Sequence, residues 1–182
     1  KVLTDFKIVP LVVGDCSLET CQKIALLLKE AIGERKDILV VVSTDLYHGY
    51  NIKEASQVDQ ATLNLFRKID DQGLYYGLRE GSAQACGGFA AVIALSLAKS
   101  YGLSELKVLS HTNSGLVTGE LVDGNWTVGY ASCAVFGQEQ EGENMLNIQQ
   151  KEKLLKIARQ AITIYLQTGK KPEVSEADPV LN

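Results

Sequence analysis

The sequence lacks the long apolar runs and the excess of positive charge that are typical of membrane and nucleic-acid-binding proteins. No apolar run reaches the length of about 20 residues that a membrane-spanning helix needs. The first residues of the sequence do not resemble a signal peptide. Its 18 Lys and Arg residues are outnumbered by 22 Asp and Glu residues, which gives a formal net charge of −4. Nucleic-acid-binding domains generally carry a basic face. We therefore expect a cytoplasmic chain with neither a nucleic-acid nor a membrane partner.

Several motifs of common enzymes and metal sites are absent as well. The GxGxxG and Walker A motifs do not occur, so nucleotide binding has no support, and the GxSxG motif of serine hydrolases is missing. The four cysteines show no CxxC spacing, which argues against a zinc site or a disulfide framework. Three of the cysteines are interpreted as packing residues: Cys16, Cys21 and Cys133.

The 182 residues suffice for one domain with a sizeable core, and their apolar pattern predicts alternating strands and helices. Helices are predicted at 18–32 (capped by Ser17 and Gly33), 55–69, 89–101 and 148–166, and strands at 7–13, 38–42, 106–110, 116–122 and 126–136. Residues 70–84 are predicted to form a polar connection, and Asp123-Gly124 to form the turn of a hairpin. A strand, a helix and a strand in succession indicate a parallel βαβ unit. We expect an α/β fold with a mixed, largely parallel sheet flanked by helices.

The most informative stretch, ILVVVSTDLYH, spans residues 38–48. Its five leading apolar residues predict a strand that is buried on both faces, and Ser43, Asp45 and His48 follow where that strand should end. Ligands of open α/β sheets bind beyond the carboxyl ends of the strands. Asp45 and His48 are therefore interpreted as an acid/base pair or as a pair beside a metal. The alternative is that Asp45 caps the next turn while His48 bonds to the backbone.

A second candidate, Cys86, precedes Gly87-Gly88 at the predicted start of a helix. A helix N-terminus lowers the pKa of a thiol, and adjacent glycines let a ligand approach closely. Cys86 is thus either a nucleophile or soft metal ligand, or a buried residue that fills a small space. A polar loop after the strand 106–110 either lines the same groove or forms a plain turn: His111, Asn113, Ser114 and Gly115.

Five sequence blocks, in their order and spacing, resemble the carboxyl-terminal half of a Memo-like protein: IVPLVVGD, VVVSTDLYH, ACGGFAAVIA, HTNSGLVTGE and VGYASCAVF. Memo-like proteins are the B proteins of the AmmeMemoRadiSam system and are similar to class III extradiol dioxygenases. The tail LNIQQKEKLLKIARQAITIYLQTGKKP resembles the opening of an AMMECR1 domain. We expect half of a Memo-like domain at 1–137, truncated at its amino terminus, then a linker at 138–147 and an incomplete AMMECR1-like domain at 148–182.

The resemblance implies a non-haem metal site that holds iron or copper. In the family, two histidine ligands come from the amino-terminal half, and a cysteine ligand comes from the ACG block, which Cys86 matches. Asp45 and His48 match the SxDxxH block that lines the same pocket, and the dioxygenase relatives carry a carboxylate in place of the cysteine ligand. Neither His48 nor His111 lies in the family's ligand histidine motifs, so the remaining ligands are expected upstream of this chain. The pocket is expected to include Ser43, Gly87, His111, Asn113 and Ser114.

The resemblance leaves two functions open. The first is a metal-dependent, dioxygenase-like oxidoreductase with an unknown small-molecule substrate. In that enzyme Cys86 binds the metal, and His48 donates or accepts a proton while Asp45 orients it. The second is a non-catalytic binding or scaffold module that acts with an AMMECR1 domain and a radical-SAM protein. Formation of a homo-oligomer is left open in both.

Overall fold

The computed structural model describes residues 6–119, 122–137 and 148–169, and the chain divides into two compact units. The larger unit is Leu11–Gln138, and the smaller one comprises residues 1–10 and 139–182. The described helix of the smaller unit is α6, Ile148–Thr168. The expected linker at 138–147 lies outside the described residues. None of the described helices is long and apolar enough to cross a membrane.

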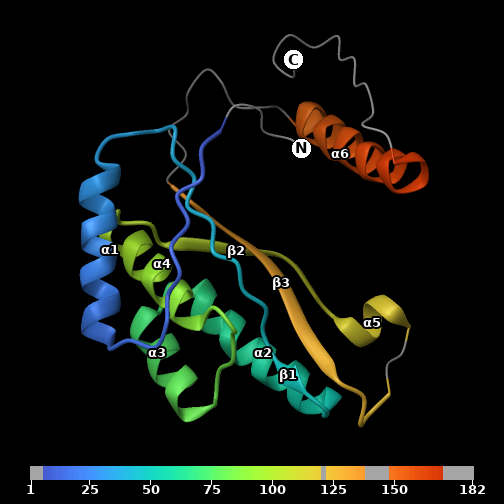
Figure 1. The fold of residues 1–182 in the computed structure, drawn as a ribbon, viewed down its shortest axis with the longest axis horizontal. Coiled ribbons are helices and arrows are strands. Elements are labelled where there is room, and N and C mark those ends of the chain that lie inside the picture. Colours follow the sequence, from blue (N-terminus) through green and yellow to red (C-terminus); the bar gives the residue numbers. More distant parts are fainter. Residues whose placement is uncertain (1–5, 120–121, 138–147, 170–182) are drawn as a thin grey trace. The chain divides into compact units, whose positions relative to one another are not determined.

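The sheet of the larger unit has three strands in the order β1-β3-β2 (Figure 1). The central strand β3, Thr127–Phe136, pairs antiparallel with β2, Glu105–Asn113, and with the two-residue strand β1, His48–Gly49. The register of β2 against β3 shifts between Val108 and Ser110. The expectation of a mixed α/β fold is confirmed, but the expectation of a largely parallel sheet is wrong because both pairings are antiparallel.

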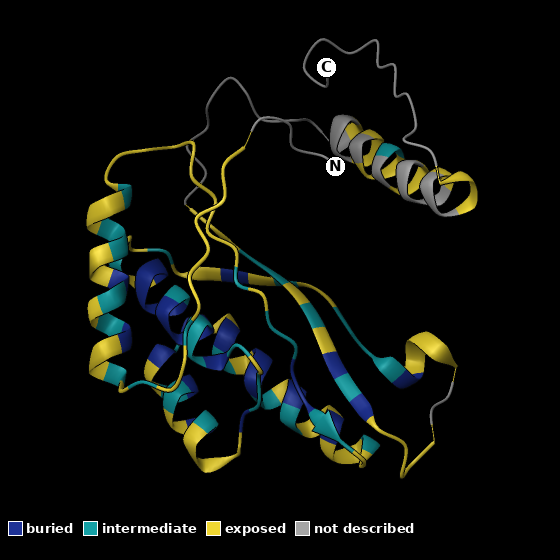
Figure 2. Ribbon diagram, in the orientation of Figure 1, coloured by how far each residue is buried: buried dark blue, intermediate teal, exposed yellow. Residues whose placement is uncertain are grey.

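Five helices complete the larger unit: α1 (Leu18–Ile32), α2 (Ile52–Arg67), α3 (Asp71–Glu80), α4 (Gly88–Ser100) and α5 (Ser114–Thr118). α4 packs between α1 and α3, while α2 contacts α3 and the strands β2 and β3. α4 is apolar on nearly all sides, and Figure 2 shows most of it as buried. Val92 on α4 is completely buried. An apolar composition on all sides is typical of a helix that lies in the core, as α4 does.

The helix boundaries follow from local capping signals. The Ser17 hydroxyl accepts a hydrogen bond from the Thr20 N–H at the start of α1, and the Gly33 N–H donates to the Lys29 carbonyl at its end. The predicted polar connection at 70–84 is wrong, since most of it forms α3. Asp70 caps that helix by accepting a hydrogen bond from the Gly73 N–H.

The segments 7–13 and 38–42, which were predicted to be strands, form no strand in the structure. Leu39 and Val41 are each about three-quarters exposed, and Figure 2 shows the segment 38–42 as largely exposed chain without regular secondary structure. A strand needs a neighbour that pairs its backbone groups, and no backbone hydrogen bond joins 38–42 to another of the described segments. The chain reaches the sheet only later, where the Leu46 N–H donates to the Gly129 carbonyl at 2.8 Å. The expected βαβ unit is therefore wrong as well.

The prediction of a hairpin between strands 116–122 and 126–136 is also wrong. Residues 114–118, of which 116–118 were assigned to its first strand, instead belong to the helix α5. The Asn113 side chain begins this helix by accepting a hydrogen bond from the Leu116 N–H at 2.9 Å. A side chain that satisfies the backbone in this way competes with strand pairing. β3 therefore pairs with β2, through a connection that contains α5.

The buried carboxylate of Asp71 joins three helices. It lies in the first turn of α3 and accepts hydrogen bonds from Ser96 Oγ of α4 at 2.6 Å and from Gln22 Nε2 of α1 at 3.3 Å. It also forms an ion pair with Lys99 Nζ of α4 at 2.6 Å. Burial alone raises the pKa of this carboxyl. The hydrogen bonds from Lys99, Ser96 and Gln22 outweigh burial, so the pKa of Asp71 lies below its usual value.

We expect Asp71 to make the stability of the fold depend on acidic pH. Because folding lowers its pKa, its stabilising contribution is complete above the ordinary value of about 3.9 and is lost as the pH falls through the lower folded-state value. Asp71→Asn should reduce the free energy of unfolding at pH 7 by about 1–3 kcal/mol and flatten its decline at acidic pH. Urea titrations at several pH values measure this.

The matched control is Asp37→Asn, because Asp37 pairs with Arg35 at the exposed surface. Exposed ion pairs contribute little, so this change should leave the free energy of unfolding at pH 7 nearly unaltered. An Asp71→Asn protein with the wild-type stability and the wild-type acid slope would contradict the structural role of Asp71.

Candidate functional site

The structure brings Asp45, His48 and Cys86 together at the start of β1. His48 Nε2 lies 3.1 Å from Asp45 Oδ2, and both side chains are less than one-third exposed. The Asp45 N–H donates to Cys86 Sγ at 3.4 Å, and the Cys86 N–H donates to the Asp45 carbonyl at 3.2 Å. The thiol of Cys86 itself is exposed. An acid, an imidazole and an accessible thiol thus share one small region.

Contacts at the start of α4 explain why Cys86 meets this segment. Gly87 precedes the first residue of α4, and its N–H donates to Thr44 Oγ1 at 2.8 Å. A Cβ atom at Gly87 would collide with the Ser43 carbonyl oxygen, so glycine permits this close approach of the two backbones. Ser43 and Gly87, two residues of the predicted pocket, therefore lie side by side.

The carboxylate of Asp45 stays ionised although it is partly buried. Burial raises its pKa, but the neighbouring Cys86 thiol and the His48 ring outweigh burial and hold the pKa below its usual value. One carboxylate oxygen, Oδ1, is buried and makes no hydrogen bond within the described part of the chain. Since an unsatisfied buried oxygen is costly, this atom is a natural acceptor for a proton donor or an ion.

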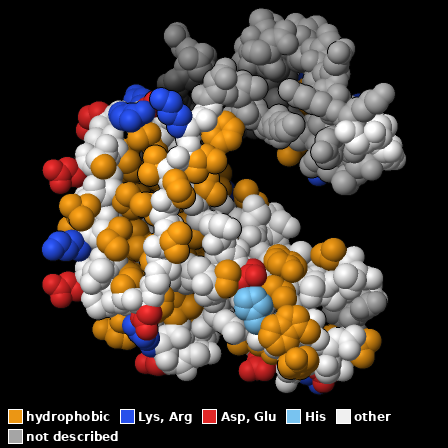
Figure 3. All heavy atoms as spheres, in the orientation of Figure 1, with side chains coloured by type: hydrophobic (Ala, Val, Ile, Leu, Met, Phe, Trp, Pro, Cys, Tyr) orange, Lys and Arg blue, Asp and Glu red, His pale blue; other side chains and the backbone are white. Residues whose placement is uncertain are grey.

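Two aromatic side chains and an amide complete the surroundings of His48. The His48 ring lies nearly parallel to the Trp126 ring, with 6.2 Å between the centroids, and Tyr50 meets Trp126 edge-on at 5.0 Å. Gln84 Oε1 accepts a hydrogen bond from the His48 N–H at 3.0 Å. Figure 3 shows a histidine beside an acidic side chain and a cluster of hydrophobic side chains on one face. Sequence reasoning missed Tyr50, Gln84 and Trp126.

The segment 45–48 also contacts Asp59, a buried residue of α2 that the sequence analysis missed. Asp59 Oδ1 accepts a hydrogen bond from the Tyr47 N–H at 3.0 Å, and Oδ2 lies 2.8 Å from His111 Nε2. A signal for Asp59 is present in the sequence, because it falls on the apolar stripe of its helix. The buried residues of α2 are Ala55, Asp59, Thr62, Leu63 and Phe66.

The remaining predicted pocket residues take part in other contacts. His111 pairs with Asp59, and Asn113 caps α5. Ser114 Oγ accepts a hydrogen bond from the Val128 N–H at 3.0 Å. His111 thus joins the end of β2 to α2, Ser114 joins the start of α5 to β3, and Asn113 caps α5, so none of the three bonds to Asp45, His48 or Cys86.

Comparisons with known proteins agree with the resemblance to Memo-like proteins that the five sequence blocks carry. Residues 1–134 match the family model described as Memo-like protein. The chain belongs to the Memo-like protein family. A MEMO1 family protein of Methanosarcina mazei is 31% identical over 132 residues, which cover 72% of this Memo-like chain and 48% of the relative. One from Thermotoga neapolitana is 30% identical over 132 residues, which cover 72% and 45% of the two chains.

The Memo-like chain spans about half the length of the curated relatives it matches. A third relative, from Sulfolobus acidocaldarius, shows the same proportion, with 31% identity over 129 residues and 44% of the relative covered. Within the described ranges, no three His, Cys, Asp or Glu side chains are grouped so that they could hold a metal ion. Asp45, His48 and Cys86 of this Memo-like chain are thus neighbours that do not form a complete set of metal ligands.

Gly129 offers a test of how the site is supported. A Cβ atom at this buried position of β3 would collide with the Asp59 carboxylate. Gly129→Ala should therefore displace Asp59 and lower the free energy of unfolding by about 1–3 kcal/mol. Gly14→Ala is the matched control, since its Cβ would meet nothing within 4 Å, and a change below about 0.5 kcal/mol is expected there. Urea unfolding measures the free energy of unfolding of both variants. Equal values for Gly129→Ala and Gly14→Ala would contradict the close packing of Gly129 on Asp59.

Proposed function

We propose that this Memo-like chain contributes to a non-haem metal site in a redox protein that resembles class III extradiol dioxygenases. The observation that supports the proposal is the exposed thiol of Cys86 beside Asp45 and His48. Thiolate, imidazole and carboxylate are donors that bind iron, copper and related transition metals. The unpartnered Oδ1 atom of Asp45 adds a buried acceptor at the same place.

The donor types fit such a metal, while their number points to further ligands. We assign the thiolate of Cys86 as one ligand, because it is the accessible soft donor of the group. The remaining ligands are proposed to lie upstream of this chain, in the part of the domain that it does not match. Bound there, iron or copper would supply the redox chemistry of the site.

His48 and Asp45 are proposed to handle protons next to Cys86. Because His48 Nε2 faces Asp45 Oδ2 at 3.1 Å, the carboxylate fixes the orientation of the imidazole ring. That contact assigns the ring proton to Nε2 and leaves Nδ1 as the atom that accepts a proton from a substrate or returns one to it. Trp126 and Tyr50 give the surroundings of His48 an apolar side against which a small organic molecule can pack.

Metal analysis of the intact Memo-like domain tests this proposal. Cys86→Ser replaces a soft thiolate by a weak hydroxyl ligand, so we expect the iron or copper content per chain to fall at least about tenfold. Elemental mass spectrometry of protein purified from metal-supplemented cells measures the content. Cys133→Ser is the matched control, since Cys133 lies half-buried in β3, and its metal content should equal that of the wild type.

Equal, stoichiometric metal in the wild type and in Cys86→Ser would remove Cys86 from the set of ligands. An absence of metal from all three proteins would favour the alternative function, a non-catalytic module that acts with an AMMECR1 domain and a radical-SAM protein. Binding of that partner by a His48→Ala protein would then support the scaffold function directly.

A further inference from the structure

Two cysteines outside the proposed metal site lie in contact where α1 begins. Cys16 Sγ and Cys21 Sγ are 3.1 Å apart, and both residues are free thiols that pack against the core. They flank the N-cap Ser17 as the residue before the cap and the fourth residue of the helix. These are the two positions of a hydrophobic staple, whose side chains regularly meet. The packing role predicted for both cysteines is confirmed, but their contact adds a chemical possibility.

The two thiols differ in accessibility, as the two members of a reactive dithiol commonly do. Cys21 is completely buried, whereas Cys16 is partly exposed. Burial and the hydrogen bond with Cys16 raise the pKa of Cys21 to about 12, so its thiol is protonated at neutral pH. Cys16 is therefore the thiol that a soluble reagent reaches first, and Cys21 is positioned to react second.

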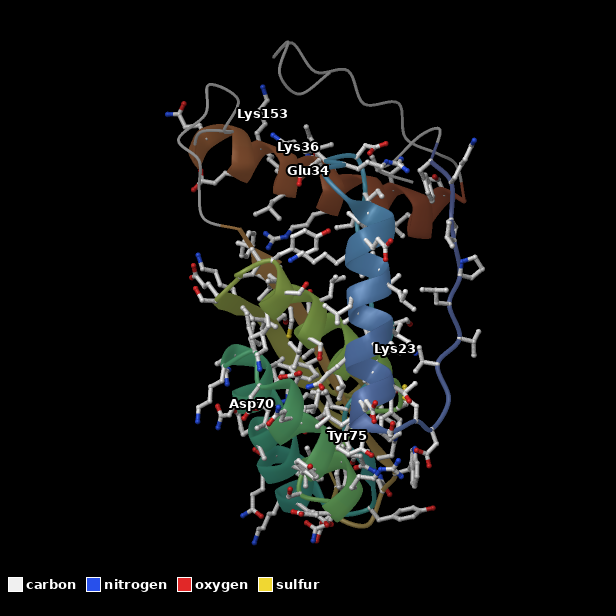
Figure 4. The ribbon with its side chains drawn as sticks, turned by 90° about the vertical axis from the view of Figure 1, so that its left-hand side faces the viewer. Lys23, Glu34, Lys36, Asp70, Tyr75 and Lys153 are labelled. Carbon is white, nitrogen blue, oxygen red and sulfur yellow. The ribbon has the colours of Figure 1, made fainter. Side chains whose placement is uncertain are left out.

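The turn that carries Cys16 is held in place from the side of α3. Arg79 forms an ion pair with Asp15 and donates a hydrogen bond from Nη2 to the Cys16 carbonyl at 3.2 Å. The Arg79 guanidinium also lies over the Tyr75 ring, and Figure 4 shows the labelled Tyr75 beside the beginning of α1. These contacts fix the backbone on one side of the sulfur pair, while α1 fixes the other side.

We propose that Cys16 and Cys21 form a redox-active dithiol that small disulfides of the glutathione class oxidise to an intramolecular disulfide. The Cys16 thiolate attacks one sulfur of glutathione disulfide, forming a mixed disulfide and releasing one glutathione thiolate. The Cys21 thiol then gives its proton to the glutathione thiolate released in the first step and attacks Cys16 Sγ, which closes the Cys16–Cys21 bond and releases the second glutathione as a thiolate. Two protein thiols are oxidised and one glutathione disulfide is reduced. The sulfur atoms need to approach by about 1 Å to reach bonding distance.

Peptide mass spectrometry of the full chain in glutathione buffers tests the proposal. Trypsin cleaves after Lys7 and Lys23, so peptide 8–23 contains both cysteines and neither Cys86 nor Cys133. After oxidation and alkylation, we expect this peptide without alkyl groups and about 2 Da lighter than its dithiol form. Recovery of peptide 8–23 with both thiols alkylated at every glutathione ratio would overturn the proposal.

Variants separate the two steps of the reaction. Cys21→Ser removes the second thiol, so it should accumulate Cys16 as a mixed disulfide with glutathione, and Cys21→Ala provides the same test with an apolar side chain at this buried position. Absence of the adduct from folded proteins of both kinds would overturn the assigned order. Cys86→Ser and Cys133→Ser should form the Cys16–Cys21 disulfide at the wild-type ratio, so this result is independent of the proposed metal site.

Comparison of the folded and unfolded chains shows whether the fold creates the dithiol. Because the native contacts hold the two sulfurs together, half-oxidation of the native chain should need about tenfold less glutathione disulfide than half-oxidation in concentrated urea. If both states needed the same concentration of glutathione disulfide, the sequence spacing alone would account for the bond. That result would overturn the role of the structure.

Discussion

The arrangement of the site depends on the buried carboxylate of Asp59. It receives the Tyr47 N–H on one side and the His111 ring on the other, while Gly129 leaves the space that it occupies. Through these contacts α2 holds the end of β2, the middle of the sheet and the loop that carries His48 in one arrangement. A buried polar group is tolerated when it is hydrogen-bonded, and both carboxylate oxygens of Asp59 have partners.

Four of the six described helices and the paired strands β2 and β3 could be predicted from the sequence, whereas α3, α5 and the two-residue strand β1 could not. The signals for α1 are local, because Ser17, Gly33 and the apolar stripe between them lie within one short segment. A strand depends on a partner that is remote in sequence. The apolar run at 38–42 therefore indicates a strand in isolation, yet it forms none, because no backbone hydrogen bond joins it to another described segment. β2 and β3 form because they pair with each other.

For the site, sequence reasoning selected the residues whose chemistry is visible in the letters. Asp45, His48 and Cys86 were selected in this way, and the structure brings them together. Asp59 was missed because a carboxylate within a helix is usually assigned to the solvent face. Trp126 was missed because its approach to His48 depends on the pairing of β3 with β1, which no local pattern reveals.

The backbone around Asp45 and His48 has a thermodynamic consequence for binding. The segment 45–48 is hydrogen-bonded through Asp45 to Cys86, through Leu46 and Tyr47 to Gly129, and through His48 to Gln84. A ligand that meets a segment already ordered in this way does not have to restrict its motion, so little conformational entropy is lost on binding there. Contact energy gained at this loop is therefore not offset by the cost of ordering the segment.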